Sequence, residues 1–159
     1  MIHMKKVIFI SSTGGHLSEL MQLKRIFNNY DYHIITEKTD TTIKLKSEYG
    51  KRIDYLVYGA RNYLFSYIFK FSYNVIKSFF LYFKIRPDVI VTTGAHTAVP
   101  ICYIAKFFKK KIIFVESFAR VNSKSMSGKM INKIADVFLV QHKELLDVYE
   151  NSIYKGDLY

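Results

Sequence analysis

Residues 7–17 read Val-Ile-Phe-Ile-Ser-Ser-Thr-Gly-Gly-His-Leu, and similar apolar runs followed by helix-like segments recur along the rest of the chain. An unbroken apolar run leads into hydroxyl side chains, a glycine pair and the start of a helix-like segment. Short continuous apolar runs are typical of strands covered on both faces of a parallel sheet. The segment therefore predicts a strand, a tight loop and a helix, which is the first unit of an α/β fold.

Further apolar runs repeat this pattern along the chain. The predicted strands are Val7–Ser11, Tyr32–Thr36, Ile53–Val57, Val89–Thr92, Lys111–Val115 and Val137–Val140. The predicted helices are Leu17–Phe27, Thr39–Tyr49, Asn62–Lys84, Thr97–Phe108, Ser125–Ile134 and Lys143–Tyr149. Because strands alternate with helices, we expect a Rossmann-like parallel sheet with helices on both faces. No linker or repeat divides the chain, so residues 1–159 are predicted to form a single domain.

Length and charge limit the function. A chain of 159 residues is too short for two α/β domains with a cleft between them, so a two-domain active site would need a partner. The 24 Lys and Arg residues exceed the 13 Asp and Glu residues, which favours an anionic partner: nucleic acid, an acidic lipid surface or a phosphorylated substrate. No nucleic-acid-binding signature is present, so we expect no nucleic acid partner. The single cysteine, Cys102, is expected to be buried in a cytosolic protein.

The loop after the first strand has the features of an anion site. Glycines and hydroxyls at a strand-to-helix turn expose backbone amides to a phosphate. The residues that we expect to bind substrate here are Ser12, Thr13, Gly14 and Gly15. His16 follows them, either as a proton-exchanging residue or as a structural cap. The spacing fits neither the P-loop nor the dinucleotide pattern, although Glu37 lies where a nicotinamide enzyme would place its ribose-binding acid.

Two later loops should reach the same edge of the sheet, because all parallel strands end there. After the fourth predicted strand the candidate binding residues are Thr93, Gly94 and His96. After the fifth they are Ser117 and Arg120, with Glu116 beside them. Glu116 is either a general base or an ion-pair partner of Arg120. Convergence of these loops predicts a site.

The loops Ser12–Leu17, Thr93–His96 and Glu116–Arg120 together resemble the membrane-associated subunit of the split N-acetylglucosaminyltransferase of dolichol-linked oligosaccharide synthesis. They resemble its bacterial relatives in capsule and exopolysaccharide assembly more closely still. The first loop is also similar to the T-G-G-H loop in the amino-terminal domain of the glycosyltransferase that makes lipid II. The dolichol-pathway subunit has an amino-terminal membrane-spanning segment, and we expect none here.

The resemblance implies a GT-B enzyme divided between two polypeptides. This chain would be the amino-terminal half, which binds a lipid-linked, undecaprenyl-diphosphate saccharide acceptor, and a partner would bind the nucleotide sugar. His16 or Glu116 would take the proton of the attacking hydroxyl, and neither a metal nor a cofactor is implied. Two alternatives stay open: a non-catalytic module that recruits a partner transferase, and a nicotinamide-nucleotide enzyme that uses Glu37.

The predicted helix 62–84 is the candidate membrane contact. Lys70, Lys77 and Lys84 recur every seven residues and should form a polar stripe together with Ser66 and Asn74. Such a stripe opposes spanning, because a lysine at the centre of a bilayer costs roughly 2.5–3.5 kcal/mol. We expect the helix to lie in the membrane interface through Phe69, Phe79 and Phe80, on the cytoplasmic face; the alternative is a core helix.

Basic residues elsewhere would add attraction to anionic headgroups, unless they form an ordinary solvated surface. They are Lys109, Lys110, Lys111, Arg120, Lys124, Lys129 and Lys133.

Overall fold

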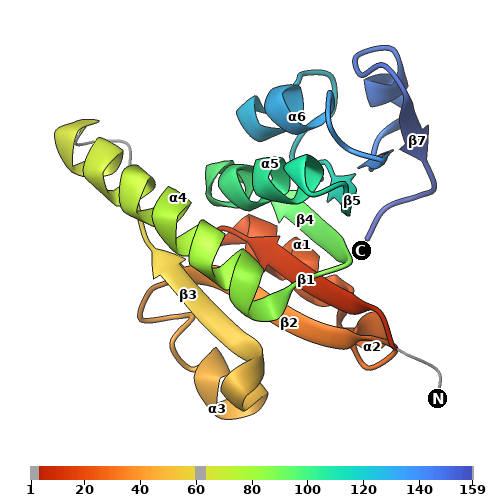
Figure 1. The fold of residues 1–159 in the computed structure, drawn as a ribbon. Coiled ribbons are helices and arrows are strands. Elements are labelled where there is room, and N and C mark those ends of the chain that lie inside the picture. Colours follow the sequence, from red (N-terminus) through yellow and green to blue (C-terminus); the bar gives the residue numbers. More distant parts are fainter. Residues whose placement is uncertain (1–3, 60–63, 159) are drawn as a thin grey trace.

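The computed structural model describes residues 4–59 and 64–158. Its sheet consists of β1 (Lys6–Ser11), β2 (Asp31–Lys38), β3 (Ile53–Val57), β4 (Val89–Gly94), β5 (Lys111–Val115), β6 (Val137–Val140) and β7 (Ser152–Tyr154). The strand order is β3-β2-β1-β4-β5-β6-β7, and every neighbouring pair is parallel. This confirms the predicted Rossmann-like fold (Figure 1).

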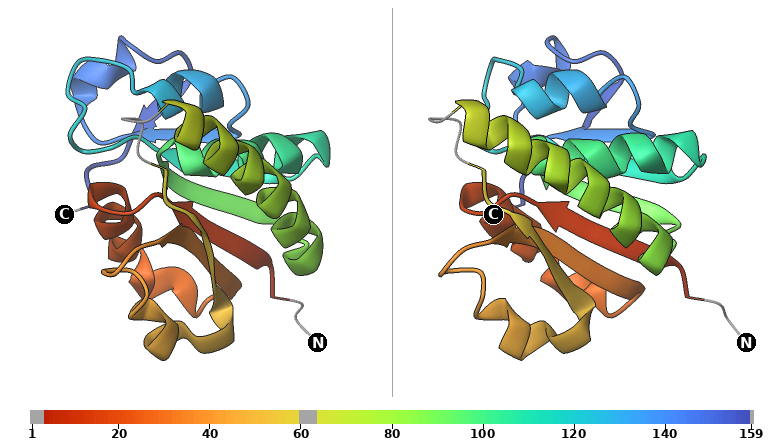
Figure 2. Two further views of the ribbon diagram at one scale, coloured as in Figure 1. Left: turned by 90° about the vertical axis from the view of Figure 1, so that its left-hand side faces the viewer. Right: turned by 60° about the vertical axis from the view of Figure 1, so that its left-hand side comes forward.

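Helices cover both faces of this sheet (Figure 2). They are α1 (Gly15–Gln22), α2 (Lys24–Phe27), α3 (Leu45–Tyr49), α4 (Leu64–Ile85), α5 (Val99–Phe107) and α6 (Met126–Ile131), with short 3₁₀ helices η1 (Gly50–Arg52), η2 (His96–Ala98) and η3 (Lys143–Leu146). The core side chains on one face pack against α4, α5 and α6, and those on the other pack against α1, α2 and α3. The predicted positions of the first six strands are confirmed, three of them with identical ends.

The structure corrects several predicted helices. The first is divided at Leu23 into α1 and α2. The second shortens to α3, because the Thr42 hydroxyl donates to the Glu37 carbonyl at 2.6 Å and holds the preceding residues in turns. The last is only the 3₁₀ helix η3, and it leads to β7, a strand that we did not predict.

The longest helix, α4, has two unlike faces. Leu81 and Tyr82 are buried in the core, whereas Phe65, Phe69 and Phe80 on the opposite face are 82%, 74% and 68% exposed. In Figures 1 and 2 the first turns of α4 extend beyond the edge at which the strands end. The outward aromatic face is therefore not covered by any part of the chain that the structure describes.

One residue that we predicted in the polar stripe of α4, Asn74, does not belong to it. Asn74 faces the sheet, where it is buried and bridges β3 by accepting from the Val57 amide and donating to the Val57 carbonyl, both at 2.8 Å. Lys70 and Lys84 remain exposed. Residue Asn62 and the side chain of Ser66 lie outside the described part. No helix in the described ranges is long and apolar enough to cross a membrane.

The position of the site follows from the strand order. The chain runs outward from β1 to β3 in one direction and from β4 to β7 in the other, so the connections diverge between β1 and β4. In open α/β sheets, ligands bind at the carboxyl ends of the strands on either side of this switch point. The loops that carry His16 and His96 begin there.

Candidate functional site

Two hydrogen bonds join the loops after β1 and β4. The Nδ1 atom of His16 lies 2.8 Å from the Thr93 carbonyl oxygen. In return, the Thr93 hydroxyl donates to the His16 carbonyl at 2.6 Å. These reciprocal contacts fix the orientation of the imidazole at the switch point.

The first of these contacts also determines the tautomer of His16. A carbonyl oxygen can only accept a hydrogen bond, so Nδ1 must carry the proton. In the neutral ring, Nε2 is then left with a lone pair that can accept a proton from a substrate. A histidine held in this way through Nδ1 is suited to act as a general base.

Gly94 makes room for the imidazole. Its φ of 96° lies in the left-handed region that favours glycine. A Cβ atom at this position would lie 3.4 Å from His16 and 3.2 Å from the Ser127 hydroxyl. Gly94 therefore allows His16 and Ser127 to approach the same point of the backbone.

A hollow of about 320 Å³ opens beside His16. It is lined by His16, Ala95, His96, Ser117, Ala119, Arg120, Ser125, Met126 and Ser127. The structure thus brings His16, His96, Ser117 and Arg120 together, as we expected. Hydroxyls, imidazoles and an exposed guanidinium can donate hydrogen bonds to the oxygens of a sugar or a phosphate.

The first-loop residues occupy the edge beside this hollow instead of its wall. Gly14 and Gly15 are exposed. Ser12 is buried, and its amide donates to the Gly94 carbonyl at 3.0 Å. Thr13 is tied by its amide to Glu37 Oε2 at 3.1 Å. Their predicted contact with a phosphate stays a prediction.

Glu116 is buried behind the hollow. Its carboxylate accepts from the Ser125 hydroxyl at 2.9 Å and from the Ser117 amide at 2.9 Å. It also accepts from the Tyr149 hydroxyl, whose pKa is raised by burial and by the neighbouring carboxylate. Within the described residues Glu116 forms no ion pair with Arg120. Its hydrogen bonds support the loop after β5, and its predicted role as a general base stays a prediction.

The hydrogen-bonded groups around Glu116 explain why residue 128 is a glycine. Ser125 is the N-cap of α6 and accepts from the Gly128 amide at 2.9 Å. A Cβ atom at Gly128 would overlap with both the Tyr149 hydroxyl and the Glu116 carboxylate. The sequence Ser-Met-Ser-Gly contains the capping serine as a recognisable signal, but Tyr149 is too distant along the chain to be predicted as its neighbour.

Glu19 is a residue that the sequence analysis missed. It is 4% exposed, and its Oε1 atom accepts from the Ser117 hydroxyl at 2.9 Å and the Phe118 amide at 3.0 Å. Its Oε2 atom has no hydrogen-bond partner among the described residues. Glu19 lies one helical turn after His16, and this spacing is the signal that could have revealed it.

Glu37 does not have the free carboxylate that a ribose-binding acid needs. It is 2% exposed, and its Oε1 atom accepts from the Thr97 hydroxyl at 2.6 Å. The other oxygen accepts from the Thr13 amide. Both oxygens therefore join the loops after β1 and β4, and the geometry gives no support to the nicotinamide alternative.

Comparisons with known proteins identify the family of this chain. The sequence profile of the family described as "Oligosaccharide biosynthesis protein Alg14 like" matches residues 6–158. The UDP-N-acetylglucosamine transferase subunit ALG14 of Mus musculus is 28% identical, over 95% of this chain and 82% of the relative. The subunit of the same name from Debaryomyces hansenii is 31% identical, over 96% of this chain and 75% of the relative.

Solved structures show the same fold in a longer chain. Acinetobacter baumannii MurG aligns with 96% of this chain at a TM-score of 0.68 and 14% identity. The chain spans only 44% of the length of that protein. With a family profile that matches nearly its whole length, the chain belongs to the Alg14-like family of oligosaccharide biosynthesis proteins.

Proposed function

We propose that this chain is the acceptor-binding subunit of a two-part UDP-N-acetylglucosamine transferase and that it recruits a nucleotide-sugar-binding partner. Family membership and the names of the relatives support the reaction class. The observation that carries a catalytic role is His16, held through Nδ1 with Nε2 left to accept a proton, beside a hollow lined by hydrogen-bond donors.

The proposed step is a direct transfer. The acceptor hydroxyl oxygen bonds to the anomeric carbon of the donor sugar as the bond from that carbon to the nucleoside diphosphate breaks. The hydroxyl proton passes to Nε2 of His16, and the electron pair of the broken bond leaves with the diphosphate. Arg120 and Ser117 at the wall of the hollow hold oxygens of the acceptor.

For the acceptor we propose an undecaprenyl-diphosphate-linked saccharide in capsular or exopolysaccharide synthesis. This assignment rests on the resemblance of the three loops to bacterial proteins of that kind. The two relatives described above are from a mouse and a yeast. An acceptor diphosphate would suit the positive charge of the chain, which is formally +11.

We further propose that the chain lies peripherally on the cytoplasmic face of the membrane through α4. The exposed side chains Phe69, Phe79 and Phe80 support this placement, because aromatic residues are favoured at the depth of the headgroups. The first turns of α4 also reach the site: the ring of Phe71 lies 6.5 Å from that of His96. A lipid-linked acceptor would therefore meet the hollow close to the membrane surface.

Reconstitution tests the proposed function. The chain, alone and together with the candidate partner, is incubated with a UDP-sugar and a polyprenyl-diphosphate-linked saccharide, and glycosylated lipid is measured. We expect transfer only when both proteins are present, because one α/β domain supplies one wall of a GT-B cleft. Robust transfer by the chain alone would overturn the divided-enzyme proposal.

A further inference from the structure

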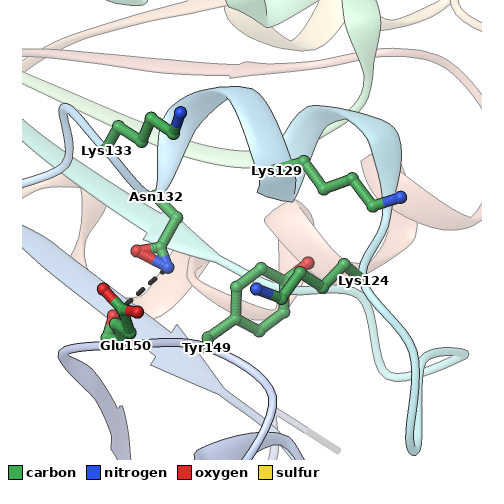
Figure 3. A pocket seen from close by; sticks show the side chains of 6 residues that line it. All are labelled: Lys124, Lys129, Asn132, Lys133, Tyr149 and Glu150. Atoms are coloured by element: carbon green, nitrogen blue, oxygen red, sulfur yellow. Dashed lines mark hydrogen bonds between the residues drawn. The ribbon is translucent and has the colours of Figure 1, made fainter.

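A second hollow lies on the outer side of α6, away from His16. Its volume is about 420 Å³, and it is lined by Lys124, Lys129, Asn132, Lys133, Tyr149 and Glu150. Figure 3 shows the first four on α6 and the chain segments flanking it, with Tyr149 and Glu150 opposite. The Asn132 amide donates to the Glu150 carbonyl at 3.2 Å and closes one side.

The charge of this hollow is strongly one-sided. It contains three lysines and one carboxylate, that of Glu150. None of these lysines forms an ion pair with a residue that the structure describes, whereas Lys106, Lys110 and Lys111 are paired with aspartates. Lys124 instead extends over the Tyr149 ring, with Nζ 5.3 Å from its centre. Uncompensated ammonium groups around a concave surface favour an anionic ligand.

The hollow borders the apolar surface of the molecule. Met126 and Met130 on α6 are 60% and 44% exposed. Tyr103 of α5 donates its hydroxyl to the Met130 carbonyl at 3.1 Å, so α5 and α6 adjoin there. Directly after α5, the ring centre of Phe108 lies 5.3 Å from that of Phe83 of α4. Exposed apolar side chains thus occur on α4, α5 and α6, and Lys129 of the hollow lies between Met126 and Met130 in the sequence of α6.

We propose that this hollow binds the phosphate group of an anionic lipid headgroup; the proposal rests on the proposed membrane contact of α4. Interfacial aromatic side chains lie at the level of the headgroups, so basic residues on the same side of the molecule can reach headgroup phosphates. Lysine ammonium groups, together with the second N–H of the Asn132 amide, are donors for phosphate oxygens. A soluble phosphate compound has the same chemistry, but the border with the apolar surface favours the lipid.

Such a contact would orient the active site. The wall residue Tyr149 donates its hydroxyl to Glu116, which accepts from Ser125 at the start of α6. Ser125 also lines the hollow beside His16. The headgroup site and the candidate catalytic site therefore share one hydrogen-bonded loop, and two points of membrane contact, α4 and α6, would fix how that loop faces the bilayer.

The test measures binding of the full-length chain to vesicles. One set is phosphatidylcholine alone, and the other contains phosphatidylglycerol in addition. The pocket variant carries Lys124→Gln, Lys129→Gln and Lys133→Gln. A matched control loses the same charge at exposed lysines near β2 and α3, through Lys38→Gln, Lys44→Gln and Lys51→Gln. A third variant, Asn132→Phe, fills the hollow without changing any charge.

We expect the pocket variant to lose about a hundredfold in affinity for anionic vesicles, because each lysine near such a surface contributes roughly fivefold. Asn132→Phe should lose most of the same affinity, and the matched control should lose little, since its lysines lie beyond the range of the surface charge. Circular dichroism and urea unfolding confirm that each variant is folded.

Two results would overturn the proposal. Undiminished binding of the folded Asn132→Phe variant to anionic vesicles would show diffuse attraction instead of a site. Saturable binding of UDP or inorganic phosphate that requires the lysines, with unchanged vesicle binding, would assign the hollow to a soluble ligand. Binding to neutral vesicles measures the α4 contact separately. No measurement here depends on sugar transfer, so failure of this proposal can be distinguished from failure of the proposed function.

Discussion

His16 shows how much chemistry a single backbone contact can determine. The Thr93 carbonyl fixes both the direction of the ring and the nitrogen that carries its proton. An asparagine at this position can donate its amide N–H to the same carbonyl, but it cannot take up a proton. Substitution by asparagine therefore separates the structural role of His16 from its proposed catalytic role.

We expect His16→Asn and His16→Ala to lower turnover of the complex by about 10²–10⁴-fold, the range for a positioned general base. The measurement is kcat for sugar transfer, with partner and acceptor binding measured in parallel. Loss of activity with the partner still bound supports catalysis by this chain. Near-normal turnover of the asparagine variant would leave the chain as a recruitment module and place the base elsewhere.

Glu19 is expected to act as a positioning residue. Glu19→Ala leaves the Ser117 hydroxyl and the Phe118 amide without their acceptor, a change that costs about 1–3 kcal/mol in stability. The loop after β5 also carries Arg120, which we propose binds the acceptor. We therefore expect KM for the acceptor to rise more than kcat falls. Glu19→Gln keeps one carbonyl oxygen and should restore most of the activity. Equal KM values for the alanine variant and wild type would refute this role.

Among the elements, α4 has two faces that differ in burial. Its inner face supplies Leu81 and Tyr82 to the core, and Asn74 fixes the helix to β3. Its outer face is aromatic, and Lys84 at its end pairs with Asp54 at 2.8 Å. Because the two faces are separate, the outer one can be changed without disturbing the core.

The triple variant Phe69→Ser, Phe79→Ser and Phe80→Ser should lose membrane binding. Burial of a phenylalanine contributes at least about 1.5 kcal/mol, so three substitutions should reduce partition roughly a thousandfold. Vesicle cosedimentation measures the effect. A control with Ile43→Ser and Ile153→Ser, which removes exposed apolar side chains from other elements, should bind as wild type does. If the folded triple variant sediments with neutral vesicles as before, α4 is not the membrane contact.

At the scale of the molecule, the sheet is covered unequally. On the side of α1 and α2, an apolar hollow of about 570 Å³ remains open, and Val91, Ile113 and Leu139 are among its lining. Exposed apolar surface of this kind marks an interaction site. We propose that a partner protein covers this hollow, because its lining is apolar and open to solvent.

Leu139→Lys should therefore weaken copurification of the partner by at least tenfold, whereas Ile43→Lys, an exposed residue remote from the hollow, should not. The partner should also raise the melting temperature of wild type, because it binds only the folded chain. Thermal unfolding of each isolated variant separates loss of binding from loss of structure. Unchanged copurification of the folded Leu139→Lys variant would place the interface elsewhere.

Local sequence was sufficient for the first six strands and for the edge at which the site lies, but not for β7. The runs Ile53–Val57, Lys111–Val115 and Val137–Val140 are strands with the predicted ends, because continuous apolarity reports burial on both faces. His16, His96, Ser117 and Arg120 meet at one hollow, because parallel strands share their carboxyl edge. These features depend on residues close in sequence and on topology.

Only the tertiary structure determined which polar side chains face solvent and which support the fold. Glu116 is separated by 33 residues from Tyr149 in sequence, and their contact removes its carboxylate from the hollow. Helical periodicity placed Asn74 with the lysines, but Asn74 is buried against β3, where it forms two hydrogen bonds with Val57. Local pattern cannot report such partners, because a buried polar group is stabilised by hydrogen bonds to residues that folding alone brings near.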